Sequence, residues 1–217
     1  YRGKYRAGTI GDIGCFSFFP TKVMTTGEGG IVTTNNKKYY EKMKSLKNFG
    51  RDINDAGIIV NPEGNNFKIN EFTGLLGSIE CDRVESRINK RSFLLERYYT
   101  NLKSTKYNVI KQKGEGVCSY YKAIITTPID SSWLKTYCKK NGVSLTGEVY
   151  KIPVHLQPLY KEQFSYVNLP NTDYYCNHHI CPPLYPELTI TEVDYICDIL
   201  KQAIIDYEEQ SSKTNTN

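Results

Sequence analysis

GCFSFFPTKVMTTGEGG, residues 14–30, places one lysine between an aromatic run and a glycine-rich turn. Residues 12–19 are aromatic and almost uncharged, which is typical of a buried strand. Lys22 follows in a polar loop, the glycines at the end of the stretch mark a turn, and residues 31–34 resume as a short β-branched strand. The stretch therefore predicts two strands joined by a loop that carries Lys22.

Helical patterns follow this stretch. Asn35 and Asn36 can cap a helix over residues 37–48, and a loop rich in Gly, Asn and Asp comes next. An apolar stripe then predicts a long helix over residues 71–102, whose length leaves room for a break near Cys81. Further along, the pattern predicts a strand over 117–127, a helix that Ser131 caps and that runs through Lys140, an irregular stretch over 143–188, and a last helix from Thr189 or Thr191.

Strands that alternate with helices indicate the α/β class. We expect two pieces, residues 1–90 and 91–210, and a disordered polar tail over 211–217.

The composition excludes several classes of protein. The formal net charge is +5, but the Lys and Arg residues are spread along the chain, so no nucleic-acid footprint is expected. No apolar run approaches the roughly 20 residues that a membrane span needs. Seven cysteines without a regular framework favour free thiols in a reducing compartment, and therefore a cytoplasmic protein.

Two other candidate sites are weak. Cys176, His178, His179 and Cys181 lie close together, but their spacing fits no standard zinc site, so no metal is expected. His155 has no Ser or Cys in an elbow motif nearby, so a hydrolase triad has no support.

Lys22 is the strongest candidate for chemistry. A lysine amine forms an imine with an aldehyde only when it is partly deprotonated, and the aromatic run before Lys22 offers apolar surroundings that lower its pKa. Ser17 lies at the end of the expected strand, where a hydroxyl can face a phosphate. Residue types alone leave open an ordinary surface lysine beside a hairpin.

Five blocks of sequence carry a family resemblance. The chain resembles the DegT/DnrJ/EryC1/StrS family of sugar aminotransferases, whose signature is roughly GxxxxFSFxxxKxxxxGEGG. The matching blocks occur in family order: Gly11 to Gly30, Gly64-Asn-Asn66-Phe-Lys68-Ile-Asn-Glu71, Arg91 to Tyr98, Pro153-Val-His155-Leu-Gln157-Pro-Leu-Tyr160, and Pro183 to Thr189.

The resemblance implies a fold and a cofactor. The fold would be the pyridoxal-phosphate (PLP) transferase fold of aspartate aminotransferase type I, with part of the large α/β/α domain and the small α/β C-terminal domain. Lys22 would form the Schiff base with PLP, Ser17 would bind its phosphate, and Asn66 would reach the phosphate in a neighbouring subunit. The protein would therefore be a homodimer with shared active sites.

The resemblance also implies the substrates. An amino group would pass from an amino acid, glutamate by expectation, to a keto-sugar attached to a nucleotide. Tyr150, Lys68 and His155 would contact the sugar nucleotide. Many relatives carry Arg where this chain has Lys68, and Arg can grip a diphosphate bidentately whereas Lys cannot.

Two alternatives stay open. A sugar dehydratase of the same family would carry His at the Schiff-base position, which Lys22 argues against. A non-catalytic, dimer-forming relative is the other. The family places further cofactor contacts upstream of the lysine, so we expect this sequence to be the C-terminal part of a longer protein and to be inactive alone.

Overall fold

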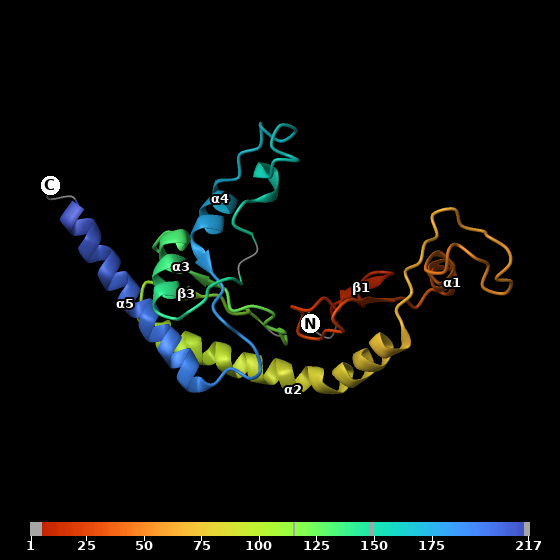
Figure 1. Ribbon diagram of the computed structural model, residues 1–217, viewed down its shortest axis with the longest axis horizontal. Helices are drawn as coiled ribbons and strands as arrows, with labels where there is room; N and C mark the ends of the chain where they lie inside the picture. The colour runs from red at the N-terminus through yellow and green to blue at the C-terminus, as the bar shows by residue number, and fades with distance from the viewer. Residues whose placement is uncertain (1–5, 115, 148–149, 215–217) are drawn as a thin grey trace. The chain divides into compact units, whose positions relative to one another are not determined.

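The computed structural model describes residues 6–114, 116–147 and 150–214 (Figure 1). The chain divides into two compact units, one formed by Tyr1–Arg87 with Lys113–Cys118 and the other by Ile88–Gln112 with Ser119–Asn217. The expected assignment of residues 1–90 and 91–210 to a cofactor domain and a small domain stays a prediction. None of the helices in the described ranges combines the length and the apolar character of a membrane span.

The first unit begins with a hairpin. Strand β1, Gly14–Ser17, pairs antiparallel with β2, Gly30–Thr33, so that Ser17 lies opposite Gly30. The strand expected over 12–19 is therefore shorter, and the prediction that it is buried was wrong, since only Gly14 is buried in β1. Two strands alone cover neither face of their own sheet, which leaves Phe16 40% exposed.

Helix α1, Lys37–Leu46, has the expected cap. The Asn36 side chain accepts hydrogen bonds from the backbone N–H groups of Lys38 and Tyr39. The helix ends two residues before the expected limit, and Phe49 and Gly50 then adopt left-handed backbone conformations, with φ of 60° and 72°. This sharp change of direction stops the helix.

Helix α2, Glu71–Leu102, is continuous, so the break near Cys81 does not occur. The sequence of α2 contains no proline, the residue that most often kinks a helix. Its residues up to Arg87 belong to the first unit and the remainder to the second.

The second unit contains a three-stranded antiparallel sheet of order β3-β4-β5. The strands are β3 (Asn108–Val109), β4 (Ile125–Thr126) and β5 (His179–Ile180). The strand predicted over 117–127 was too long, and β5 lies in the stretch expected to be irregular. Strands of two residues are too short to show an alternating pattern.

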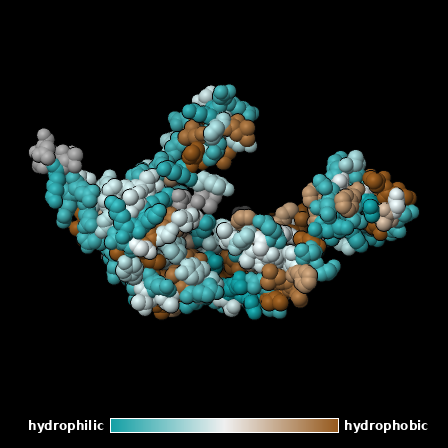
Figure 2. Space-filling view, in the orientation of Figure 1, coloured by the Kyte–Doolittle hydropathy of each residue, from teal (hydrophilic) through white to brown (hydrophobic). Residues whose placement is uncertain are grey.

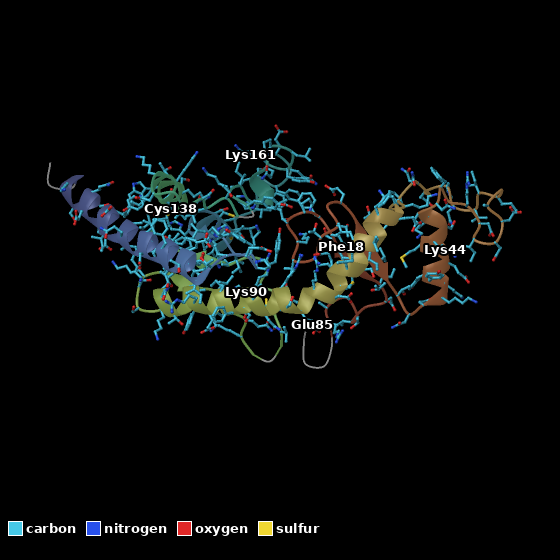
Figure 3. All side chains as sticks on the ribbon, turned by 60° about the horizontal axis from the view of Figure 1, so that its bottom comes forward. Phe18, Lys44, Glu85, Lys90, Cys138 and Lys161 are labelled. Carbon is cyan, nitrogen blue, oxygen red and sulfur yellow. The ribbon has the colours of Figure 1, made fainter. Side chains whose placement is uncertain are left out.

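Two helices complete the core of this unit. Helix α3, Ser131–Lys140, packs against α5, Ile190–Thr214, and Asp130 rather than Ser131 caps α3. Burial raises the pKa of the Cys138 thiol on α3 to about 12 (Figure 3). The core residues from the helices share the inner faces of α2, α3 and α5: Leu94, Leu95, Tyr98, Leu102, Leu134, Cys138, Val193, Cys197 and Leu200.

The stretch from 143 to 188 also contains helical segments. These are a 3-10 turn, Val154–Leu156, and helix α4, Pro170–Asn177, which starts with proline in its first turn. The disordered tail was wrong for residues 211–214, which continue α5. There Ser211 Oγ and Ser212 Oγ donate to the Tyr207 and Glu208 carbonyls one turn earlier. The rest of that tail lies outside the described residues.

Candidate active site

Hydrogen bonds close the loop that carries Lys22. The Phe18 N–H donates to the Gly29 carbonyl at 2.9 Å, and the Phe18 carbonyl accepts from the Thr26 N–H at 3.1 Å and from Thr25 Oγ1 at 2.9 Å. Within the loop, the Lys22 N–H donates to the Phe19 carbonyl at 2.9 Å. Lys22 therefore lies at a turn whose two ends are fixed together, and its side chain is half-buried.

Ser17 lies at the entrance to this loop. It is the last residue of β1, and its side chain is exposed. Its Oγ accepts the Phe19 N–H at 3.3 Å, which leaves the hydroxyl proton for another acceptor. One loop thus presents a lysine amine and a serine hydroxyl.

Helix α2 anchors the loop through a buried ion pair. Arg87 Nη1 donates to the Val23 carbonyl at 3.3 Å and lies 2.5 Å from Glu80 Oε2, while Arg87 Nη2 donates to Glu80 Oε1 at 2.9 Å. Glu80 is only 4% exposed. Arg87, oriented by the buried Glu80 carboxylate, thus links the residue next to Lys22 to the helix.

Glycines are required on the facing strand. A Cβ at Gly29 would lie 2.7 Å from Thr26 Oγ1, and Gly29 has a φ of 148°. A Cβ at Gly30 would lie 2.8 Å from the Phe16 carbonyl oxygen. The conformation of the loop therefore depends on the Gly29-Gly30 pair.

Asn66 lies in a second segment of the first unit. It forms an isolated bridge with Asn48, and the neighbouring Phe67 N–H donates to the Lys47 carbonyl at 3.1 Å. These bonds attach the segment before α2 to the end of α1. The Asn66 side chain is exposed and can meet a ligand.

Lys68 lies beside an aromatic ring in the same region. Its Nζ is 5.4 Å from the centroid of the Phe49 ring, and the guanidinium carbon of Arg51 is 5.5 Å from the same centroid. Sequence reasoning did not identify Phe49 or Arg51. At these distances each cation is attracted to the ring by a cation–π interaction.

Tyr150 and His155 line one pocket of the second unit. The pocket has a volume of about 570 Å³, and the other lining residues are Pro153, Val154, Phe164, Val167, Leu169, Thr172 and Cys176. Tyr150 is 63% exposed, whereas His155 is buried with Nε2 3.4 Å from Asp173 Oδ1 on α4. Sequence reasoning missed α4, although proline followed by polar residues is a known signal for the start of a helix.

The histidines considered for zinc have another role. His178 Nδ1 and His179 Nδ1 donate to the carbonyls of Tyr174 and Tyr175 at the end of α4. Within the ranges that the structure describes, no three His, Cys, Asp or Glu side chains gather closely enough to share a metal ion.

Comparisons with known proteins agree on one family. The model of the DegT/DnrJ/EryC1/StrS aminotransferase family matches residues 1–201. The chain is 28% identical to GDP-perosamine synthase of Escherichia coli O157:H7, over 93% of this chain and 54% of that protein. It therefore spans about half the length of the curated relatives that it matches.

Solved structures share the fold. Helicobacter pylori PseC, an aminotransferase involved in the biosynthesis of pseudaminic acid, superposes with a TM-score of 0.79 at 23% identity, over 93% of this chain and 55% of that one. Streptococcus pneumoniae Spr1654 in its PLP form gives a TM-score of 0.77 at 24% identity, over 92% and 53%. The mixed α/β fold of PLP-dependent aminotransferases, expected from the sequence, is confirmed.

Proposed function

The chain belongs to the DegT/DnrJ/EryC1/StrS aminotransferase family, and on that premise we propose that it is part of an enzyme that transfers an amino group from an amino acid, glutamate by expectation, to a nucleotide-linked keto-sugar. The observation that carries the proposal is the loop of Lys22, closed on itself and tied to α2 by Arg87. Its products would serve the synthesis of amino sugars and of polysaccharides that contain them.

The residues present fit PLP. The cofactor needs an amine for its aldehyde and hydrogen-bond donors for its phosphate, and the loop supplies Lys22 and the Ser17 hydroxyl from one fixed segment. Asn66 supplies an exposed amide for the phosphate of a neighbouring subunit's cofactor. When bound, PLP serves as an electron sink for the carbon that gains or loses the amino group.

Lys22 would have two roles. Its amine would hold the cofactor, and as a free amine it would be a base that moves a proton to and from the reacting carbon. The hydrogen bond from the Lys22 N–H to Phe19 and the anchor at Val23 fix the backbone on both sides of that amine. A fixed backbone on both sides of Lys22 lowers the entropy cost of orienting its amine towards the reacting carbon.

Tyr150 and Lys68 would bind the sugar nucleotide directly, and His155, also expected to contact it, would support them. The pocket next to Tyr150 is mostly apolar, which suits the face of a sugar ring or a base, and the partly exposed tyrosine hydroxyl can bond to a sugar oxygen. His155 is buried against Asp173, so its contribution is to hold the segment that carries Tyr150.

A homodimer would complete the site. Four residues of α2 at positions i, i+3, i+4 and i+7 expose apolar side chains in the first unit: Phe72 (85%), Leu75 (62%), Leu76 (41%) and Ile79 (39%). Figure 2 shows hydrophobic residues gathered over the start of α2. An exposed apolar stripe of this kind marks an interface, and a second copy would cover it.

A cytoplasmic location is part of the proposal. All seven cysteines lie within the described residues and are free thiols, as expected in a reducing compartment.

The test is the visible absorbance of the whole protein. Purified with PLP, it is expected to be yellow, with an absorption band in the violet that borohydride bleaches, and to form glutamate-dependent product with a keto-sugar nucleotide. Lys22→Ala is expected to lose both. Lys44→Ala, on the exposed side of α1 (Figure 3), removes an equal charge and is the matched control. A borohydride-sensitive band that persists in Lys22→Ala would refute the assignment.

A further inference from the structure

Phe49 combines strain with exposure. Its φ of 60° lies in the left-handed region, which is costly for a residue with a bulky side chain, and its ring is 42% exposed. Strained, non-glycine backbone persists only where the surroundings enforce it, and such positions cluster at functional sites.

The surroundings of Phe49 do enforce it. The Phe49 N–H donates to the Asn65 carbonyl at 3.0 Å, and the Gly50 N–H donates to the Ser45 carbonyl at 3.0 Å. A Cβ at Gly64 would lie 1.9 Å from the Gly50 nitrogen, so the two chain segments touch backbone to backbone. The ring is therefore held in place by the backbone rather than by burial.

The two cations beside the ring have no carboxylate partner in the described part of the chain. Arg51 and Lys68 each contact Phe49, and neither forms an ion pair there. Asp52, the neighbouring acid, is engaged in its own turn, where Oδ1 accepts the Asn54 and Asp55 N–H groups at 2.8 and 3.1 Å. Two unpaired like charges near one ring are a favourable place for a polyanion.

We propose that Arg51 and Lys68 form a two-cation clamp on the Phe49 ring that binds the diphosphate of the sugar nucleotide. The inference rests on the proposed function and adds Arg51 to the substrate-binding residues. Lys68 offers a point charge, whereas the planar guanidinium of Arg51 can donate two parallel N–H bonds to phosphate oxygens. Arg51 thus provides the bidentate contact that a lysine at position 68 cannot make.

A diphosphate fits the clamp better than the phosphate of PLP does. Two cations, at 5.5 and 5.4 Å from one ring centroid, match two linked phosphate groups in number and charge, and the single phosphate of PLP already has Ser17 and Asn66 as donors under the proposed function. Both cations lie beside a ring whose backbone is held by hydrogen bonds, which reduces the entropy lost on binding.

The experiment separates the two halves of the reaction. In the whole protein with PLP bound, GDP, UDP and inorganic pyrophosphate are titrated by calorimetry, and conversion of the cofactor by glutamate alone is followed by absorbance. Arg51→Gln and Lys68→Gln are each expected to weaken binding of the best of these ligands on the order of tenfold. The affinity for the diphosphate is expected to fall by a larger factor than the rate of conversion by glutamate, a half-reaction in which no nucleotide takes part. Arg51→Lys, which keeps the charge and loses the fork, should lie between.

Control measurements distinguish a failure of the clamp from a failure of the proposed function. Lys37→Gln removes the same charge from an exposed site on α1 and should leave binding unaltered. If Arg51→Gln binds the diphosphates as tightly as the unaltered protein, or if it weakens PLP rather than the diphosphates, the clamp is wrong. If the unaltered protein reacts with no amino-acid donor, the proposed function fails, while the pyrophosphate titration still tests the clamp.

Discussion

Gly64 shows how one residue determines the shape of the first unit. A methyl group at this position would lie 1.9 Å from the Gly50 nitrogen and 2.2 Å from its Cα. Neither atom can move without breaking two hydrogen bonds, one from the Gly50 N–H to the Ser45 carbonyl and one from the Val60 N–H to the Gly50 carbonyl. Gly64→Ala is therefore expected to destabilise the protein by about 2 kcal/mol, as overpacking of a tight contact does.

The measurement is the midpoint of urea unfolding for the whole protein. Gly57→Ala is the matched control, because its added methyl group would meet only the side chain of Asp55 at 3.1 Å. A Gly64→Ala protein as stable as Gly57→Ala would show that the two segments are not in contact.

Individual site residues could be predicted from the sequence where they belong to a motif, but not where a strained backbone conformation determines their role. Lys22 and Ser17 could be singled out because the residues around them form a recognisable pattern. The role of Arg51 could not, because it depends on the left-handed conformation of Phe49. Nothing in local sequence signals that conformation, which comes from the contact of Gly50 with a segment more than ten residues away.

At the scale of elements, one ion pair joins α2 to α5. Arg97 Nε and Nη2 donate to the two carboxylate oxygens of Asp194 at 2.6 and 2.8 Å, and Asn101 donates to the same carboxylate at 2.7 Å. The hydrogen bonds from Arg97 lower the pKa of Asp194. A lowered pKa means that the folded state binds the proton less tightly than the unfolded state does.

Its contribution to stability should therefore be fully present above the unfolded pKa of about 3.9 and be lost as the pH falls through the lower folded value. Asp194→Asn is expected to lower the melting temperature at pH 6, and the gap to the unaltered protein should close towards pH 3. Asp198→Asn, on the same helix in a more exposed pair with Lys201, should change little at either pH. A gap for Asp194→Asn that is equal at both pH values would contradict the lowered pKa.

Helices with a long apolar pattern were predicted from the sequence better than short elements were. The limits of α2 and the end of α3 were predicted correctly, because apolar residues that recur over several turns indicate a helix, whereas the start of α3 was placed one residue late. Strands β3 and β5 were missed, since two residues carry no period and their pairing with β4 is set by the fold. Helix α4 was missed because proline was taken as a sign of irregular chain rather than as a first-turn residue.

At the scale of the whole molecule, the sequence predicted an α/β fold in two parts, and the structural neighbours confirm the fold. The segment Lys113–Cys118, which belongs to the first unit although it follows residues of the second, could not be predicted. The unit to which this segment belongs is set by its contacts in the folded chain, which the local sequence does not reveal. The exposed face of α2 was also hidden from sequence reasoning, because an amphipathic stripe looks the same whether it faces a core or a partner.

That face provides a test of the assembly. Replacing both Phe72 and Leu75 with Asp places two charges on the most exposed apolar residues of α2, and in the proposed homodimer these charges would be buried without partners. The double variant is expected to sediment as a monomer at concentrations where the unaltered protein is a dimer. Because a site completed by Asn66 from a neighbour needs the dimer, transamination should fall together with dimerisation and recover partly at high protein concentration.

The control for this variant is Leu159→Asp, which charges an apolar side chain that is 80% exposed in the second unit and should leave the dimer intact. Circular dichroism separates dissociation from unfolding. A folded double variant that remains dimeric would show that the stripe lies outside the interface. If the double variant unfolds, the single variant Leu76→Asp, at a less exposed position of the same stripe, repeats the test, and a folded, dimeric Leu76→Asp protein would contradict the interface.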